Sequence, residues 1–162
     1  IIKVNDIDLK YVSQNWTKNV SYLSQSYFIF NDSIKNNIIL DFNENKNIDK
    51  NLYNDCVKKT GMEEFIKTLP EGDSMQVVDF GKNLSGGQKQ KIAFSRLLYK
   101  NCKVIILDEA MSAIDYEGRK KINDLLISIK KDKIIIIISH HNDDLKICDK
   151  IYEINNHQLK EI

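Results

Sequence analysis

The stretch Leu84-Ser85-Gly86-Gly87-Gln88 is followed, one helix length later, by Val104-Ile105-Ile106-Leu107-Asp108-Glu109-Ala110. The first stretch is typical of a helix start at which a serine caps free backbone amides and two glycines let a phosphate approach them. The second is an apolar strand that ends in two adjacent carboxylates. A plain helix cap and a solvated turn explain each stretch taken alone, whereas the two in this order and spacing favour a protein that handles ATP.

Length, composition and charge narrow the class of protein. A chain of 162 residues with 42% hydrophobic and 29% charged residues fits one globular domain, or a domain with a subdomain. Its formal net charge of +1 provides no basic field for nucleic acid or for an anionic membrane surface. The longest apolar run, Ile134 to Ile138, is far shorter than the roughly 20 residues of a membrane helix and predicts a buried strand.

The three cysteines, Cys56, Cys102 and Cys148, lie far apart and form no C-x-x-C pair. This pattern argues against a disulfide framework and against a zinc site, and it fits a reducing compartment. The chain also begins at Ile1 inside a strand-like pattern, so we expect it to be a piece of a longer protein.

The first hundred residues predict a little β-structure and then a mainly helical region. The apolar residues change from alternation to helical spacing after Ser33, and the only proline, Pro70, closes one of the predicted helices. The predicted elements are a hairpin over residues 2–9, a strand from Val20 to Leu23 that ends at Gln25, helices between Ser33 and about Lys100, and a loop over residues 71–83.

The second half predicts a helix followed by a strand–helix–strand unit. Apart from the lysine that begins each, residues 103–107 and 133–138 are apolar without alternation, as in a parallel sheet that is covered on both faces. Between them, Ile122, Leu125, Leu126 and Ile129 have helical spacing and predict a crossover helix, so the unit should be right-handed. The flanking elements are a helix over residues 85–99 and a closing hairpin around Asn155-Asn156.

Polar residues follow the predicted strands at the edge where open α/β sheets bind ligands. Asp108 can hold Mg²⁺ through water, and Glu109 can orient or deprotonate an attacking water. His140 lies beside them if the two apolar strands are neighbours, and Gln25 can reach the same edge as a neutral ligand. A structural histidine and a solvated glutamine are the simpler interpretations of these two residues taken alone.

Taken together, these residues resemble the nucleotide-binding domain of ABC transporters over nearly the whole chain. The similar segments, in order, are the Q-loop at Tyr22-Leu23-Ser24-Gln25, the signature at residues 84–88, Walker B at residues 104–109, the D-loop at Ser112-Ala113-Ile114-Asp115 and the H-loop at Ser139-His140. The order of these motifs makes the resemblance specific.

Two further stretches resemble the exporter branch of that family. Residues 25–30 and 33–38 are similar to a Q-x-x-x-x-F pattern followed by T-I-x-x-N-I, and Leu69-Pro70-Glu71-Gly72 is also exporter-like. Before the signature, exporters carry a T-x-V-G-E-R-G loop that contacts the transmembrane domain. Here residues 75–81 keep the acid only as Asp79 and lack the arginine, so this contact departs from the family pattern in detail.

The resemblance implies a role for each polar residue at the strand ends. Asp108 would support Mg²⁺, Glu109 would be the general base, and His140 would contact the γ-phosphate of ATP. Gln25 would be a further ligand of the metal and the attacking water, and would link them to the transmembrane domain.

Domains of this family associate head to tail, so the resemblance implies that the signature contacts the ATP held by a partner. Ser85, Gly86, Gly87 and Gln88 would bind that nucleotide, and Asp115 would lie at the dimer interface. The implied partners are a second ABC ATPase domain and the transmembrane domain of an exporter, with no nucleic acid. The implied location is the cytoplasmic face of the cell membrane.

The implied fold is α/β, a partial P-loop NTPase (RecA-like) ABC ATPase core with a helical subdomain that carries the signature. Its expected parts are residues 1–30 with the Q-loop, the helical subdomain over residues 31–100, and residues 101–162 with Walker B, the D-loop and the H-loop. The phosphate loop G-x-x-x-x-G-K-[ST] is absent. Because this loop is absent, we expect this chain alone to be inactive. The resemblance implies that the full-length protein hydrolyses MgATP for export.

Two other functions are compatible with the same motifs. A regulatory module would keep the dimer surface of an ABC domain without binding nucleotide alone. An ATPase of the DNA-repair or chromosome-structure type would carry a long coiled coil between the Q-loop and the signature, whereas no sustained heptads or basic stripe occur there.

Overall fold

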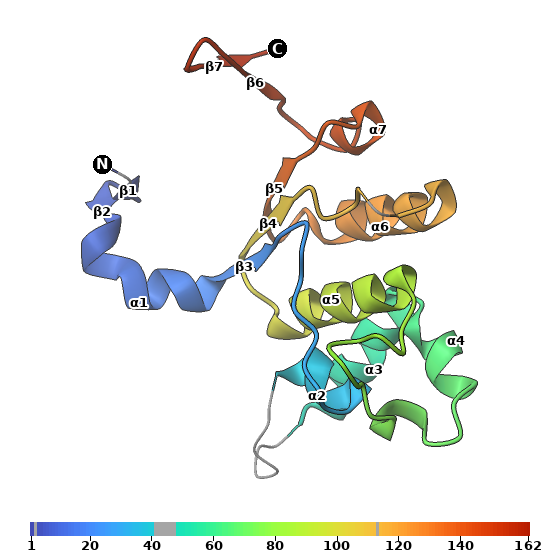
Figure 1. The fold of residues 1–162 in the computed structure, drawn as a ribbon. Helices are drawn as coiled ribbons and strands as arrows, with labels where there is room; N and C mark the ends of the chain where they lie inside the picture. Colours follow the sequence, from blue (N-terminus) through green and yellow to red (C-terminus); the bar gives the residue numbers. More distant parts are fainter. Residues whose placement is uncertain (2, 41–47, 113) are drawn as a thin grey trace.

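The computed structural model of the chain describes residues 1, 3–40, 48–112 and 114–162, with the side chains of these residues except 13–15. A parallel sheet of β3 (Val20–Leu23), β4 (Val104–Asp108) and β5 (Ile134–Ile138) forms its centre, in the order β3-β4-β5 (Figure 1). The register aligns Leu23, Leu107 and Ile137 across the three strands. The predicted α/β class and the two neighbouring apolar strands are therefore confirmed.

A helical unit connects β3 to β4 and packs against the sheet through its last and longest helix. Its helices are α2 (Ile34–Ile39), α3 (Lys50–Lys59), α4 (Met62–Lys67), the short 3₁₀ helix η1 (Gly72–Ser74) and α5 (Gly86–Lys100). Ser33 and Asp49 cap α2 and α3 by accepting hydrogen bonds from first-turn amides. The helix before Pro70 ends at Lys67, three residues earlier than the proline.

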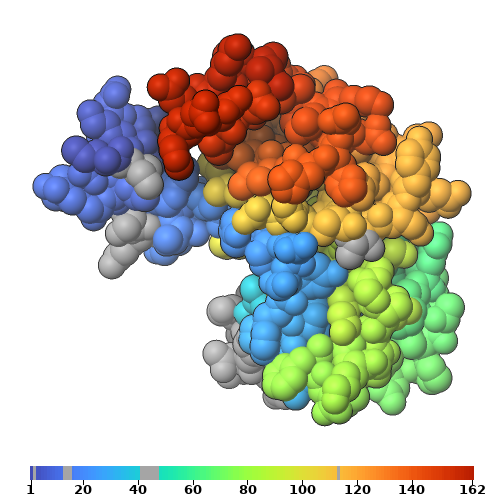
Figure 2. All heavy atoms as spheres, turned by 45° about the horizontal axis from the view of Figure 1, so that its top comes forward, coloured from blue at the N-terminus to red at the C-terminus, as the bar shows by residue number. Residues whose placement is uncertain are grey.

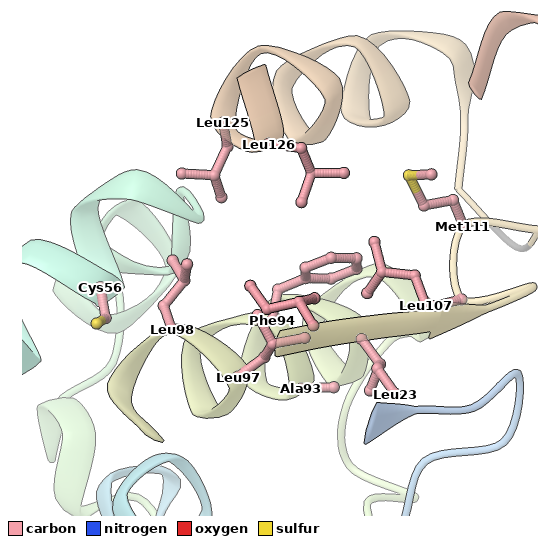
Figure 3. Packing of buried hydrophobic residues seen from close by; sticks show 12 residues of the cluster. Leu23, Cys56, Ala93, Phe94, Leu97, Leu98, Leu107, Met111, Leu125 and Leu126 are labelled. Carbon is pink, nitrogen blue, oxygen red and sulfur yellow. The ribbon is translucent and has the colours of Figure 1, made fainter. Parts of the chain in front are cut away.

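Helix α5 belongs to both hydrophobic clusters and so joins the helical unit to the sheet. Its Phe94 and Leu97 pack with Leu107 of β4 and with α6 (Tyr116–Ile129), while Ile92 packs with α2, α3 and α4. Figure 3 shows Phe94, Leu107 and Leu126 meeting between these elements. The crossover helix between β4 and β5 is thus confirmed as α6.

Only one face of the sheet is covered within the described residues, so the prediction that the second apolar strand is buried on both faces is wrong. Ile135 and Ile137 face the core, whereas Ile134, Ile136 and Ile138 are 63%, 46% and 48% exposed. The strands follow one another in order across the sheet, and successive right-handed crossovers in one direction place α5 and α6 on the same face. The opposite face, called the open face below, is therefore largely exposed along β5, although Val104 of β4 is buried there.

The two ends of the chain are small units that extend from the sheet (Figure 1). The predicted first hairpin is present as β1 (Lys3–Val4) and β2 (Ile7–Asp8), and it is followed by α1 (Leu9–Asn19), which the sequence pattern did not predict. After β5 come α7 (Asn142–Leu145) and a hairpin of β6 (Tyr152–Asn155) and β7 (Gln158–Glu161).

Two predicted boundaries shift in the structure. β3 ends at Leu23, its last residue paired with β4, so Gln25 lies in the bend beyond the strand. The closing turn is at Asn156-His157 rather than Asn155-Asn156, because both of these residues adopt the positive φ angles that a tight hairpin turn needs. The predicted D-loop residue Ala113 and hairpin residue Ile2 lie outside the described residues.

Candidate functional site

The two predicted carboxylates lie at the carboxyl end of β4, where the sheet meets solvent. Asp108 is the last residue of the strand, and the backbone N–H of Glu109 donates to the carbonyl of Ile138 on β5 over 2.9 Å. Glu109 has a φ of 49°, in the left-handed region that a side chain with a Cβ rarely adopts. Such backbone strain concentrates at functional sites, because the surroundings must hold it in place.

Glu109 and His140 come together as the sequence predicts for adjacent strands. The Nε2 atom of His140 lies 2.8 Å from a carboxylate oxygen of Glu109. The imidazole is 87% exposed and the carboxylate 30% exposed, so the pair faces solvent at the rim of the sheet. A carboxylate held in this way can accept a proton from a water molecule, while an exposed imidazole beside it can donate a hydrogen bond to an anionic substrate.

Asp108 has a hydrogen-bond partner that the motif reading missed. The Tyr22 hydroxyl donates to its carboxylate over 2.7 Å, and this hydrogen bond raises the pKa of Tyr22. Tyr22 and Asp108 both point to the open face, two rows apart in the register of β3 and β4. Counting alternate residues on two paired strands would have found the contact, but only once their pairing was known.

The possible ligands at this edge fit a Mg²⁺ ion whose coordination shell is completed by water and phosphate. Tyr22 engages one oxygen of Asp108 and leaves the other for the ion or its water, and Gln25 is exposed on the same rim, beyond the end of β3. Mg²⁺ usually takes one or two protein ligands and keeps several waters. Among the described residues, no group of three His, Cys, Asp or Glu side chains forms a cage for a metal.

The signature forms the start of α5 with a complete capping box. The Ser85 hydroxyl accepts from the backbone N–H of Gln88 over 3.2 Å, and the Gln88 side chain accepts from the N–H of Ser85 over 2.8 Å. A Cβ added to Gly86 or Gly87 would meet nothing within 4 Å. Packing within this chain therefore gives no reason for the two glycines, and their bare backbone is open to a molecule from outside.

Two contacts that the sequence did not predict tie the start of α5 to other motifs. The Tyr27 hydroxyl, just after the Q-loop, donates to the carbonyl of Gly86 over 3.3 Å. The amide of Gln90, which is buried, donates to the carbonyl of Ala110 over 2.6 Å, directly after Glu109. The signature helix and the Glu109 turn are therefore held in a fixed relation within one chain.

Asp115 has a local structural role that the sequence reading did not assign to it. Its side chain accepts from the backbone N–H of Gly118 over 2.7 Å and caps α6. The carboxylate is exposed, so capping leaves its outer oxygen accessible. The proposed position at a dimer interface stays a prediction, as do the ligand roles of the other site residues.

An exposed aromatic patch, formed by Phe28, Phe30 and Phe80, lies on the helical unit. The ring centroids are 4.8 Å apart for Phe28 and Phe30 and 5.4 Å apart for Phe28 and Phe80. Phe28 and Phe80 are 54% and 60% exposed. Figure 2 shows the segment after β3 side by side with the loop before α5, the two segments that supply these rings.

Comparisons with known proteins agree with this arrangement. The family model described as ABC transporter matches residues 1–112. The chain is 39% identical over 139 residues to an ATP-dependent lipid A-core flippase of Pseudoalteromonas translucida, covering 86% of this chain and 24% of that protein. It is 37% identical over 161 residues to the multidrug resistance protein pgp-1 of Caenorhabditis elegans, covering 99% of this chain and 12% of that protein.

The structural comparison gives the same result. A bacterial Atm1-family ABC exporter with ATP bound superposes with a TM-score of 0.88 and 26% identity, over 98% of this chain and 28% of the exporter chain. This chain thus spans about a quarter or less of the proteins it matches. None of the helices in the described ranges combines the length and apolar character needed to cross a bilayer. The chain belongs to the ABC transporter family and corresponds to the ATP-binding domain of its exporter members.

Proposed function

We propose that this chain supplies the general base, the histidine and a metal ligand of an exporter's ATPase site, and that the whole protein hydrolyses MgATP to move a substrate across a membrane. The observation that carries this proposal is the Glu109–His140 contact of 2.8 Å beside Asp108. This contact brings Glu109, which is expected in Walker B, next to His140, which is expected in the H-loop, at one edge of the sheet.

In this mechanism the residues act on one water molecule and one phosphate. Glu109 accepts the proton of the attacking water, and His140, next to it, donates a hydrogen bond to the γ-phosphate. Asp108 and Gln25 would hold the water shell of Mg²⁺, which when bound neutralises charge on the phosphates. The hydrogen bond from Tyr22 fixes the Asp108 carboxylate in place for this purpose.

The phosphate loop must come from outside this chain, and the open face supports that requirement. Tyr22 of β3 and Ile134, Ile136 and Ile138 of β5 are all exposed there, and β5 has no outer neighbour within the described sheet. A further strand and helix with the loop between them would pair with β5 and cover this face. The isolated chain is therefore proposed to be inactive, because loop amides and a lysine normally stabilise the β- and γ-phosphates.

The signature is proposed to bind ATP held by a second ABC domain in a head-to-tail dimer. Gly86 and Gly87 are exposed, and no described neighbour is close enough to require a glycine at either position. They form the first turn of a 15-residue helix, at the positive end of its dipole. Ser85 and Gln88 hold that helix start in place, and Asp115 is proposed to lie at the same dimer interface.

The aromatic patch is proposed as the contact with the transmembrane domain. Phe28 lies three residues after Gln25, so a segment docked on this patch can move Gln25 as well. Exposed rings of this kind are typical anchors of a protein interface. The proposed location is the cytoplasmic face of the membrane, which agrees with three cysteines that are all free.

Glu109→Gln in the full-length protein tests the central proposal. The amide keeps the size of the side chain but cannot accept a proton, so ATP hydrolysis should fall at least about 100-fold while ATP binding remains. Glu117→Gln is the matched control, since Glu117 is exposed on the first turn of α6 and should leave turnover unchanged. Undiminished hydrolysis by Glu109→Gln would remove Glu109 from the role of base.

Gly87→Ala tests the role of the signature separately from folding. Because a Cβ at this position meets nothing in the chain, the free energy of unfolding should stay the same or rise by up to about 1 kcal/mol. Hydrolysis by the assembled transporter should nevertheless fall about tenfold or more, since the methyl group would occupy the path of the partner's phosphate. Hydrolysis at the original rate would contradict the proposed dimer site.

A further inference from the structure

The Glu109–His140 contact is part of a closed ring of contacts. Ser139, next to His140, donates from its hydroxyl to Asp144 over 2.6 Å. The same Asp144 oxygen lies 3.5 Å from Nη1 of Arg119, and Nη2 of Arg119 donates to the carbonyl of Met111 over 3.1 Å. Met111 lies two residues after Glu109, so the ring returns to the carboxylate from which it started.

The centre of this ring is an ion pair inside the protein. The Asp144 side chain is 1% exposed and the Arg119 side chain 11% exposed. The other carboxylate oxygen of Asp144 has no hydrogen-bond partner among the described residues. A buried carboxylate with one unsatisfied oxygen is costly, so packing alone does not account for an aspartate here.

Each contact in the ring fixes backbone next to a catalytic group. The Ser139 hydroxyl donates to Asp144 and also accepts from the N–H of His141 over 3.0 Å, so it holds the chain on both sides of His140. On the other side, the N–H of Ser112 donates to the carbonyl of Glu109 over 3.1 Å, and Arg119 holds the intervening Met111. Asp144, paired with Arg119, links the two sides through side chains.

We propose that Asp144, with Arg119, is a positioning residue that sets the distance between His140 and Glu109 during ATP hydrolysis. This inference rests on the proposed function, in which those two residues act on the γ-phosphate and the water. Asp144 touches neither, so its effect passes through Ser139 to His140 and through Arg119 to the turn after Glu109. A shift of either group by a fraction of an ångström slows a step that depends on alignment.

Asp144→Asn in the full-length protein tests the proposal. The amide can still accept from Ser139 but no longer balances the charge of Arg119, so kcat should fall about tenfold with the KM for ATP within about twofold. Asp143→Asn is the matched control, because Asp143 is the adjacent residue, exposed and paired with Lys146 over 2.6 Å. It should leave both constants unchanged. A normal kcat for Asp144→Asn, or a change in KM alone, would overturn the proposal.

A double-mutant cycle separates positioning from a general loss of stability. Ser139→Ala breaks the link to His140 but keeps the Arg119–Asp144 pair, so the variant should fold even if Asp144→Asn does not. It should also lower kcat about tenfold. Because Asp144 acts in part through Ser139, the double variant should lose less than the product of the two single losses, whereas fully multiplied losses would overturn the proposal. Glu109→Gln is measured in parallel to distinguish this proposal from the proposed function. If Glu109→Gln abolishes hydrolysis while Asp144→Asn and Ser139→Ala hydrolyse ATP at the normal rate, only the positioning role fails.

Discussion

The helical unit and the open face of the sheet differ in how fully their residues are satisfied. In the helical unit, Asn37 is completely buried, its Oδ1 accepts from the N–H of Phe30, and its Nδ2 donates to the carbonyls of Phe30, Asp32 and Ser33. On the open face, Ile134, Ile136 and Ile138 expose about half of their surface or more. One region has a partner for every polar group of a buried asparagine, whereas the other has apolar side chains that stay about half-exposed within the described residues.

A half-buried arginine, Arg96, extends this satisfied network to α5. Arg96 donates from Nε to the carbonyl of Asn37 over 2.8 Å and from Nη1 to the carbonyl of Phe28 over 2.9 Å. Burial lowers the pKa of Arg96 to about 10, which still leaves the guanidinium charged at neutral pH. The network connects the segment that carries the aromatic patch to the signature helix. The helical unit is thus held together by its own residues, whereas one face of the sheet keeps exposed apolar side chains within the described residues.

The largest effect on stability is expected for Asn37→Leu. The substitution leaves the buried N–H of Phe30 and the guanidinium of Arg96 short of an acceptor, so the free energy of unfolding should fall by about 3 kcal/mol. Urea unfolding of the domain within its full-length protein measures the change. Asn36→Ala is the matched control: Asn36 is half-buried, its side chain makes one hydrogen bond, to Asp32, and its loss should cost about 1 kcal/mol.

Equal losses for these two variants would mean that the Asn37 network contributes no more than a surface contact. The difference between the regions would then lie only in their apolar packing. A loss confined to Asn37→Leu would show that hydrogen bonding of buried polar groups, and not only apolar burial, stabilises the helical unit.

Much of the fold follows from local patterns in the sequence. The Ser85 cap, the helical spacing of Ile122 to Ile129 and the unbroken apolar runs of β4 and β5 are each decided by neighbours in sequence. Helix α1 was missed although Leu9, Val12 and Trp16 have helical spacing, because Leu9 was interpreted as part of the first hairpin. The exposed face of β5 could not be predicted. An apolar run indicates that a strand can be buried, but it does not indicate which element covers it.

The candidate site divides in the same way. Glu109 and His140 were predicted to meet because residues that follow adjacent parallel strands share one edge, and the 2.8 Å contact confirms this. Tyr22, Gln90 and Asp144 were not predicted. The partners in their three contacts are separated in the sequence by 86, 20 and 5 positions, and no motif or periodicity predicts such pairs. They depend on the register of the strands and on the packing of α5 and α7.

A smaller effect, which depends on pH, is expected at Cys56 on α3. Burial raises the pKa of its thiol to about 11 from 9.0. The unfolded chain therefore loses this proton first, so the contribution of Cys56 to stability is complete below pH 9 and is lost as the pH rises through 11. The loss between these pH values should be about 1–2 kcal/mol.

Comparing the unfolding of wild type and Cys56→Ala at pH 8 and pH 11 isolates this contribution from that of the tyrosines. The difference between the two proteins should shrink at the higher pH, because the wild type alone carries the thiol. A difference that does not change with pH would show that the thiol is not buried in solution. The core of the helical unit would then be less well packed than the structure indicates.

The smallest effect is expected on the open face. Ile136→Thr should cost less than about 0.5 kcal/mol in this chain, because its side chain already contacts solvent, whereas Ile137→Thr on the covered face should cost about 1–2 kcal/mol. The two residues are neighbours in the same strand, so β-propensity and hydrogen bonding are matched. In the full-length protein the cost of Ile136→Thr should rise toward that of Ile137→Thr, since an element that covers the open face would bury it. A cost that stays small there would mean that this face remains bare, and the contrast between the two regions would then belong to the whole protein.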